Sequence, residues 1–444
     1  MEYGDRLFWG ERTEDAGDIY MCIDLKSFFA SVECVERGLD PMMTDLVVAD
    51  SERSRNTICL AVTPHMKSLG VSNRCRICDI PSNIAYITAP PRMQKYLDYS
   101  ADIYGIYLDF VSSEDVHIYS IDEVFIYATP YLKLYKMTPR EFAFAIMKKI
   151  YKKTGIRSSC GIGTNMYLCK IALDIMAKHT LDFVGELDEK KYREQLWDHL
   201  PLTDFWRIGR GTAARLSKYG INTMRDIAHT DQELLYSWFG VDAELLIDHS
   251  WGRESVRMSD IKAYRSKSRS ISSSQVLMRD YGYADARVVL CEMCDSLILD
   301  LVREAKVCSS VSVGVGYSDN FGSDVGGMSK TFDKATSSKL QIMETVLSLY
   351  DRICERSAAV RRLCLTFGGI CEDDGIQYSF FDDIEAIEQE IAVQNTVIDI
   401  KKKYGKNSIL RGISYTEAAT ARERNDMIGG HKSGKKTAAS YVKS

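Results

Sequence analysis

The chain has 444 residues, which predicts more than one domain, because a domain commonly takes about 150 residues. Hydrophobic residues make up 45% and charged residues 27%, with a formal net charge of −5, so we expect an ordered globular protein without a uniformly basic surface. No apolar run approaches the roughly 20 residues of a membrane span, and no secretory signal is visible at the N-terminus. We therefore expect a cytoplasmic protein that has no membrane partner.

The 13 cysteines are scattered through apolar contexts, which is typical of buried reduced thiols rather than of a disulfide framework. Two pairs, Cys75 with Cys78 and Cys291 with Cys294, have the spacing of zinc ligands. They are far apart in the chain and no histidine cluster accompanies either pair. We do not predict a zinc site.

The first 185 residues alternate between strand and helix patterns, which predicts an α/β layer with mixed sheet order. The segment 116–130, "VHIYSIDEVFIYATP", reads as one buried strand with Asp122 and Glu123 in its middle. The N-cap of the last helix is Thr164 or Asn165. The other expected elements are strands at 19–23, 44–50, 57–64 and 158–163 and helices from about 27, 65–71, 93–111, 139–153 and 166–178.

The rest of the chain divides into a helical part, 186–256, and a second alternating unit. Between them, residues 257–265 read as a basic linker. The second unit has the β-α-β-β-α-β order of a ferredoxin-like fold. Its expected elements are a strand at 266–277, a helix at 283–305, strands at 308–317 and 327–333, a helix at 337–355 and a strand at 359–370.

Asp24 lies at the end of the first strand, and a pair of acids, Asp122 and Glu123, lies in a later strand of the same layer. A buried carboxylate costs several kcal/mol unless a cation meets it. Three converging carboxylates are the donors that Mg²⁺ prefers, and two such ions clamp both oxygens of a phosphoryl displacement. The alternative is that these acids are capping or surface residues.

Four motifs carry a resemblance: "CIDLKSFFASVE", "YSIDEVFI", "CGIGTNMYLCKIALDIMAKH" and "IGRG". In this order and at these separations they closely resemble the Y-family DNA polymerases, in particular the UmuC-like members of Gram-positive bacteria. The resemblance runs from about Tyr20 to Gly430. It implies a right-hand polymerase with a palm at 1–27 and 94–185, fingers at 28–93, a helical thumb at 186–256, a basic linker at 257–265, a little finger at 266–371 and a C-terminal tail at 372–444.

The resemblance assigns roles to individual residues. Asp24, Asp122 and Glu123 match the carboxylates that hold two Mg²⁺ ions, with the main-chain carbonyl of Leu25 as a further ligand. Phe29 matches the aromatic steric gate under the sugar of the incoming nucleotide, whereas the neighbouring Phe28 is more typical of a core residue. The nucleotide-binding set that we predict is Phe28, Phe29, Lys67 and Lys178.

Some positions allow another interpretation or depart from the family. Lys170, Asp174 and Lys178 follow one another at helical spacing and could simply form a salt-bridge ladder. Better-known branches have a Tyr and an Arg that grip the triphosphate where this chain has Pro64 and Lys67. At the second position after Asp24, many members carry Asp or Asn and this chain has Lys26.

Two further segments match family features that bind DNA or a partner. "RIGRGTAARLSKYGI" resembles a helix-hairpin-helix, in which Gly209 and Gly211 expose backbone N–H groups to a DNA phosphate. "QYSFF" resembles the peptide by which bacterial polymerases dock on the sliding clamp. Basic residues also lead into the second alternating unit, and we expect Arg265, Lys267 and Arg269 among them to bind DNA. The clamp-binding residues that we predict are Gln377, Ser379, Phe380 and Phe381.

We predict a template-directed DNA polymerase of the translesion type, which takes primer-template DNA and dNTPs as substrates. Further partners that we consider are a sliding clamp, a recombinase filament and accessory subunits. The alternatives are a nucleotidyl cyclase and a catalytically inactive polymerase-like accessory protein that binds DNA or the clamp. "GGHKSGKKT" near the C-terminus is not a P-loop, because Lys436 stands where Ser or Thr should hold the metal.

Overall fold

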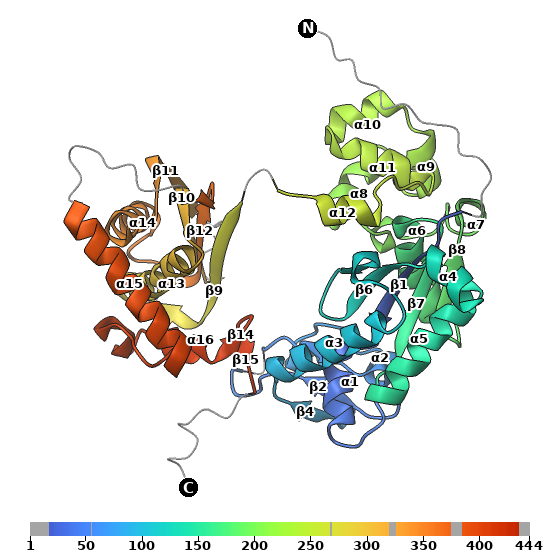
Figure 1. The fold of residues 1–444 in the computed structure, drawn as a ribbon, viewed down its shortest axis with the longest axis horizontal. Coiled ribbons are helices and arrows are strands. Elements are labelled where there is room, and N and C mark those ends of the chain that lie inside the picture. The colour runs from blue at the N-terminus through green and yellow to red at the C-terminus, as the bar shows by residue number, and fades with distance from the viewer. Residues whose placement is uncertain (1–16, 55, 267–268, 319–325, 374–383, 435–444) are drawn as a thin grey trace. The chain divides into compact units, whose positions relative to one another are not determined.

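The computed structural model describes residues 17–54, 56–266, 269–318, 326–373 and 384–434. The chain divides into two compact units (Figure 1). One comprises Met1–Pro91 and Lys95–Tyr264, and the other Arg92–Gln94 and Arg265–Ser444. In the part of the chain that is described, no helix is long and apolar enough to cross a membrane.

A five-stranded sheet with the order β5-β6-β1-β7-β8 forms the centre of the first unit. β1 runs antiparallel to both neighbours, and β8 is parallel to β7. Five of the six residues of β1 are buried, which is why its sequence reads as a continuous apolar run. The strands are β1 (Tyr20–Leu25), β5 (Val116–Ile118), β6 (Glu123–Tyr127), β7 (Ser158–Gly163) and β8 (Val184–Leu187).

The segment 116–130 is not one strand, so this prediction was wrong. The N–H groups of Tyr119 and Ser120 both donate to the carbonyl oxygen of Glu123, at 3.0 Å each, and close a tight turn between β5 and β6. Asp122 therefore lies in the turn, while Glu123 begins β6. The apolar residues on both sides of the turn made the segment look continuous.

Helices cover the sheet, among them α3 (Met93–Leu108), α4 (Thr129–Tyr135) and α5 (Pro139–Thr154) (Figure 1). The predicted helix 166–178 consists of α6 (Met166–Ile171), a π-helical turn (Ala172–Met176) and a 3-10 turn (Ala177–His179). Of the two predicted caps, Asn165 is the N-cap, and its Oδ1 accepts the Leu168 N–H at 2.8 Å.

Two glycines of β7 let α6 approach the sheet closely. A Cβ atom at Gly161 would lie 2.0 Å from the Cys169 carbonyl oxygen, and one at Gly163 would lie 2.3 Å from the Cys169 nitrogen. Any larger residue would push the helix away from the strand. The two glycines therefore place α6 directly against β1 and β7.

A small three-stranded sheet with the order β3-β2-β4 follows β1 in the chain. Its strands are shorter than predicted, and only two residues of the expected strand 57–64 pair with β2. Two short helices accompany it, and Thr63 caps the second. The elements are α1 (Phe28–Val35), β2 (Leu46–Val48), β3 (Ala61–Val62), α2 (Pro64–Ser68) and β4 (Ile87–Ala89).

A helical bundle closes the first unit, and its core is continuous with the buried face of α6. Its helices are α7 (Glu189–Gln195), α8 (Arg210–Ser217), α9 (Met224–His229), α10 (Gln232–Phe239), α11 (Asp242–Ser250) and α12 (Met258–Ala263). α12 occupies most of the predicted linker 257–265, which is therefore not an extended linker. It forms because Asp260 accepts the Arg257 N–H at 2.8 Å and Met258 is buried.

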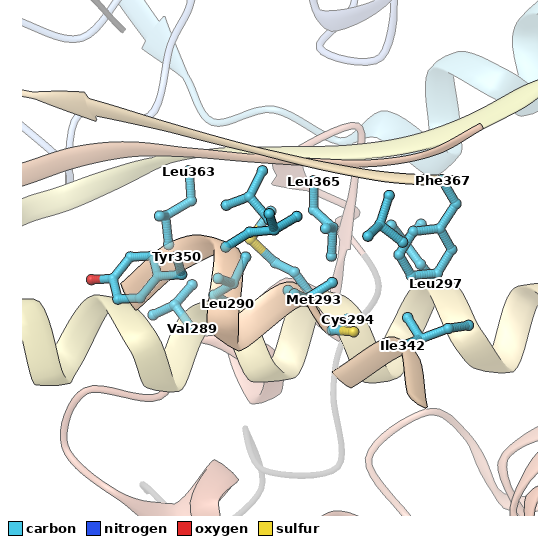
Figure 2. Close-up of a cluster of buried hydrophobic side chains, with 14 of the residues drawn as sticks. Val289, Leu290, Met293, Cys294, Leu297, Ile342, Tyr350, Leu363, Leu365 and Phe367 are labelled. Carbon is cyan, nitrogen blue, oxygen red and sulfur yellow. The ribbon is translucent and has the colours of Figure 1, made fainter. Parts of the chain in front are cut away.

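The second unit confirms the predicted β-α-β-β-α-β order. Its sheet has the strand order β11-β10-β12-β9, and these pairs are all antiparallel. Figure 2 shows one sheet face packed on the helices. The elements are β9 (Ser270–Tyr281), α13 (Tyr283–Arg303), β10 (Lys306–Tyr317), β11 (Gly326–Thr336), α14 (Lys339–Ile353), β12 (Val360–Gly368) and β13 (Cys371–Glu372).

The segment predicted as a C-terminal tail contains further secondary structure. Helix α15 contacts α13, and the buried Glu292 of α13 accepts the N–H groups of Thr420 and Ala421 at 2.8 and 2.9 Å. Much of the segment is therefore packed onto the second unit. Its elements are α15 (Ile384–Tyr404), a 3-10 turn (Gly412–Tyr415), α16 (Ala421–Asn425), β14 (Met427–Ile428) and β15 (His431–Lys432).

Candidate active site

The register of the central sheet brings the three predicted carboxylates into one neighbourhood. Asp24 on β1 lies directly opposite Glu123 on β6. The N–H of Leu25 donates to the main-chain carbonyl of Asp122 at 2.9 Å. Because residues opposite each other in an antiparallel pair point to the same face, the Asp24 and Glu123 side chains share one side of the sheet.

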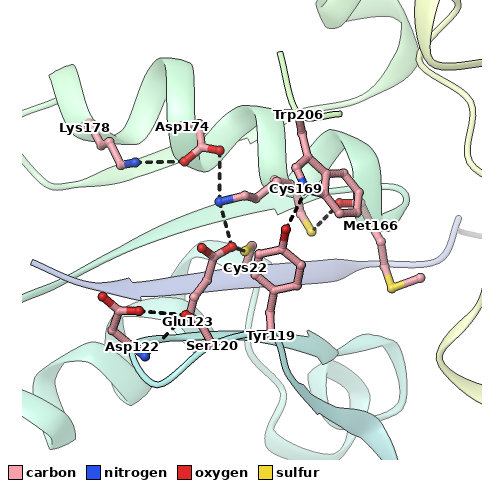
Figure 3. Close-up of polar contacts among 11 residues, drawn as sticks. Cys22, Tyr119, Ser120, Asp122, Glu123, Met166, Cys169, Asp174, Lys178 and Trp206 are labelled. Carbon is pink, nitrogen blue, oxygen red and sulfur yellow. Dashed lines mark hydrogen bonds and ion pairs between the residues drawn. The ribbon is translucent and has the colours of Figure 1, made fainter. Parts of the chain in front are cut away.

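Glu123 is held by a cation that the sequence analysis did not assign to the site. Its Oε1 lies 2.7 Å from the Nζ of Lys170 and accepts the Cys22 thiol at 3.1 Å (Figure 3). Lys170 is only 6% exposed. Burial alone would lower the pKa of Lys170, but Cys22, Asp174 and Glu123 together raise it, so this lysine stays protonated.

Lys170 and Lys178 share one carboxylate, Asp174, in the π-helical turn. The Nζ of Lys170 lies 2.9 Å from Asp174 Oδ2, and that of Lys178 lies 2.8 Å from Oδ1 (Figure 3). The salt-bridge ladder, which was the alternative interpretation of these residues, therefore exists, and it ends on Glu123. The helical spacing of Lys170, Asp174 and Lys178 was visible in the sequence. The contact of Lys170 with Glu123 was not, because it joins two distant segments.

Asp122 is positioned by its own turn. Its Oδ1 accepts the Ser120 hydroxyl at 2.7 Å, and the Ser120 Oγ also accepts the Asp122 N–H at 3.4 Å. This local bond fixes the carboxylate where the β5–β6 turn meets β1. Ser120 belongs to the motif "YSIDEVFI", but the sequence predicted no role for it.

Asp24 shows how strongly the site concentrates negative charge. Burial raises the pKa of Asp24 to about 7; Lys178 opposes this rise, and Asp122 and Glu123 add to it. A carboxyl group in such a position gains most from a cation that can approach it directly. At Asp24, burial therefore outweighs the attraction of Lys178.

Among the described residues, no group of three or more His, Cys, Asp or Glu side chains is arranged so that it could hold a metal ion. Glu123 points to Lys170 and Asp122 to Ser120. The donor chemistry nevertheless fits a hard divalent cation, since Asp24, Asp122, Glu123 and the Leu25 carbonyl offer only oxygen. Lys170 lies on Oε1 of Glu123, and the second carboxylate oxygen, Oε2, is a further donor of this set.

The two predicted aromatic residues differ in environment. Phe28 is 2% exposed and belongs to the core, as the sequence suggested. Phe29 is half-buried and stacks on Tyr96, with ring centroids 4.5 Å apart and an interplanar angle of 17°. Tyr96 in turn donates a hydrogen bond to Glu33 at 2.8 Å. Tyr96 thus supports Phe29, and nothing in its sequence context indicated this.

Two further lysines lie within electrostatic reach of Asp24. Burial lowers the pKa of Lys67, and Asp24 opposes that shift. Burial lowers the pKa of Lys26 in the same way, and its Nζ lies 3.9 Å from the centroid of the Phe183 ring. Neither lysine forms an ion pair with any described residue. Both therefore keep capacity for an anionic ligand near the carboxylates.

The predicted helix-hairpin-helix glycines lie at the beginning of α8. Gly209 is its N-cap, Gly211 lies in the first turn, and a Cβ atom added at either would meet nothing within 4 Å. Both are exposed. The first N–H groups of a helix have no partner within the helix, so this end presents donors to solvent.

In the second unit, the sheet face away from the helices carries small polar residues. Ser312 of β10 pairs with Ser329 of β11 and Thr366 of β12, and Thr366 pairs with Ser272 of β9. Arg265 and Arg269 are exposed beside β9. Lys267 and the clamp-binding residues Gln377, Ser379, Phe380 and Phe381 lie outside the described residues.

Comparisons with known proteins agree with this architecture. Residues 23–174 match the impB/mucB/samB family, and residues 268–380 match the C-terminal domain of the same family. The UV-damage repair protein UvrX of Bacillus subtilis is 33% identical over 420 residues, which cover 93% of this chain and 97% of that protein. DNA polymerase IV 2 of Halalkalibacterium halodurans is 29% identical, with 93% and 99% covered.

A solved structure, a Y-family DNA polymerase chimera, superposes with a TM-score of 0.61 at 20% identity and covers 80% of this chain and 99% of its own. This likeness extends over both of the units described above. Together with the family matches and the 33% identity to UvrX, this likeness in fold identifies the family of the protein. The chain belongs to the Y family of DNA polymerases, in its UmuC-like branch.

Proposed function

We propose that this Y-family polymerase extends a primer on a damaged DNA template, by transfer of a nucleotidyl group from a dNTP to the primer 3′-hydroxyl. The observation that carries the proposal is the β1–β6 register, which sets Asp24 opposite Glu123 and brings the Asp122 backbone to Leu25. Oxygen donors on two adjacent strands, with lysines around them, suit phosphoryl transfer, which needs mainly position and charge neutralisation.

Family membership brings dependence on a divalent metal, and we propose two Mg²⁺ ions held by Asp24, Asp122, Glu123 and the Leu25 carbonyl. When bound, these ions supply the charge that lowers the pKa of the primer hydroxyl and stabilises the leaving pyrophosphate. Lys170 holds Glu123 in place, at 2.7 Å.

Lys67 and Lys178 would bind the triphosphate as point charges, since neither offers the bidentate geometry of arginine. Lys26, which has no carboxylate partner among the described residues, adds a third positive charge beside Asp24. Phe29, stacked on Tyr96, would act as the steric gate that excludes a 2′-hydroxyl. Phe28 contributes by packing behind it.

For DNA, we assign residues 1–27 and 94–185 to the palm, 28–93 to the fingers, 186–256 to the thumb and 266–371 to the little finger. The α8 N-terminus at Gly209 and Gly211 would hold a backbone phosphate. The serine- and threonine-rich face of β9, β10 and β12 offers hydroxyl groups to a DNA backbone, and Arg265, Lys267 and Arg269 would add positive charge to this DNA contact.

The proposed partners beyond DNA and dNTP are a bacterial sliding clamp, through Gln377, Ser379, Phe380 and Phe381, and a recombinase filament or accessory subunits. A peptide with this pattern suits a preformed hydrophobic pocket. The alternative, a catalytically inactive accessory protein, is not favoured, because the carboxylates and the lysines around them are all present in the family motifs.

The test is extension of a labelled primer with Mg²⁺ and dNTPs, opposite undamaged and abasic template positions. We expect template-dependent extension that falls at least about 10²-fold in Asp122→Ala. The matched control is Asp102→Ala, which removes an exposed carboxylate from α3. Equal activity of Asp122→Ala and the wild type would contradict the proposal.

A further inference from the structure

The turn that carries the catalytic acids is bonded to the chain just before α8. The indole Nε1 of Trp206 donates to the Tyr119 hydroxyl at 3.0 Å (Figure 3). Tyr119 is the first residue of the 119–122 turn, and Trp206 precedes Gly209 by three residues. One hydrogen bond thus joins the 119–122 turn, which carries Asp122, to the segment that leads into the N-terminus of α8, where we propose that a phosphate binds.

Ring packing makes this connection more rigid than a single hydrogen bond. The Tyr119 ring lies edge-on to Trp206, with centroids 6.0 Å apart, and edge-on to Phe125, with centroids 5.6 Å apart. Phe125, which is buried on β6, also packs on Trp206 at 5.9 Å. Edge-to-face contacts at these distances are favourable, because the positive edge of one ring meets the negative face of the other.

Trp206 is also fixed from the other side. Arg207, the next residue, has a left-handed φ of 74°, and its guanidinium carbon lies 4.8 Å from the Trp206 ring centroid. A left-handed conformation is unfavourable for a residue other than glycine and persists only where its surroundings determine it. The backbone at Arg207 therefore turns the chain from Trp206 into α8 in one defined direction.

The stability of the fold gives little reason for this bond. Tyr119 is 45% exposed, so its hydroxyl could bond to water instead. Its place in the turn, however, decides the direction of the acids that follow. Ser120 holds Asp122, and the carbonyl of Glu123 accepts the Tyr119 N–H.

We propose that Tyr119 and Trp206 are positioning residues that couple DNA binding at the α8 N-terminus to the placement of Asp122 and Glu123. This inference rests on the proposed polymerase function. A phosphate held at Gly209 restrains Trp206, the hydrogen bond restrains Tyr119, and the turn then holds the carboxylates in the orientation that binds metal. Neither residue touches the reacting atoms.

The experiment is a double-mutant cycle with Tyr119→Phe, which removes only the hydroxyl, and Trp206→Phe, which removes the donor. We expect each variant to lower the single-turnover extension rate about 5- to 10-fold, in line with a coupling of about 1 kcal/mol, and the double variant to fall no further. The Mg²⁺ concentration for half-maximal rate rises several-fold, while the DNA Kd measured by fluorescence anisotropy without Mg²⁺ changes less than 2-fold. Tyr236→Phe, at an exposed α10 tyrosine, is the control.

Rate effects that multiply in the double variant would overturn the inference, as would a Tyr119→Phe variant with wild-type rate and Mg²⁺ dependence. Tyr119→Phe keeps the ring and its packing, so its result stands even if Trp206→Phe folds poorly. A wild-type protein without template-dependent extension would contradict the proposed function, and this inference with it. An active wild type with unaffected variants would overturn the inference alone.

Discussion

The two large sheets of this protein differ in where they place charged and polar side chains. The sheet of the first unit buries β1 on both faces and gathers Asp24, Asp122, Glu123 and Lys170 at one end of it. The sheet of the second unit buries one face against α13 and α14 and leaves hydroxyl groups on the other. In the first sheet, partly desolvated charges interact strongly with one another. In the second, the exposed face carries hydroxyl groups and the exposed Arg362 of β12.

We expect the largest effect on activity from a substitution at the charged end of the first sheet. Glu123→Gln removes a negative charge but keeps the shape and an acceptor for Lys170, so we expect the extension rate to fall about 10²- to 10³-fold with little change in Tm. Glu186→Gln, at an exposed glutamate of β8 in the same sheet, is the control. Retention of wild-type rate by Glu123→Gln would contradict the assignment of this residue as a metal ligand.

The second effect concerns stability. Lys170→Met leaves the buried Glu123 and the neighbouring Asp174 without their shared cation, so we expect the free energy of unfolding of the first unit to fall by about 3 kcal/mol. Chemical denaturation followed by tryptophan fluorescence measures this. Lys190→Met is the control, because it removes only the exposed ion pair between Lys190 and Glu194, whose N–O distance is 3.9 Å. The denaturation midpoint of this variant should equal that of the wild type. Similar midpoints for the two variants would show that the buried pair is not structural.

The third effect is a pH dependence of the metal-free protein. Because burial and neighbouring acids raise the pKa of Asp24 to about 7, the folded state keeps a proton that the unfolded state releases near pH 4. Stability therefore falls as the pH rises from about 4 to 7. In EDTA, Asp24→Asn should have a higher Tm than the wild type at pH 8 and a similar Tm at pH 4. A difference that is independent of pH would contradict this origin.

The smallest effect is expected on the second sheet. Ser312→Asp places a negative charge in the middle of the polar face, so we expect the DNA Kd to rise a few-fold at low salt and less at high salt. Ser312→Ala is the matched control and should bind DNA as the wild type does. Equal DNA affinity of Ser312→Asp and wild type would exclude this face as a DNA contact.

The sequence by itself determined the order of the elements in the second unit up to residue 371 and much of the order around the central sheet, because these elements follow from local periodicity, turn residues and caps. The β-α-β-β-α-β unit and the first strand, which carries Asp24, are examples. For the helix cap, the sequence left Thr164 and Asn165 open, and the structure has Asn165. The motif spacing also determined the family, and with it the carboxylates. These signals are local or lie at fixed positions along the chain, so they can be read without a three-dimensional model.

Only the tertiary structure decided how the acids are held. The turn at 119–122, the bond from Trp206 to Tyr119 and the ion pair between Lys170 and Glu123 join residues that are distant in sequence or hidden within apolar runs. The fold of α12 in the expected linker depended likewise on burial of Met258. Strand register and burial set these contacts, and neither can be derived from periodicity, because periodicity gives the face of an element but not its partner.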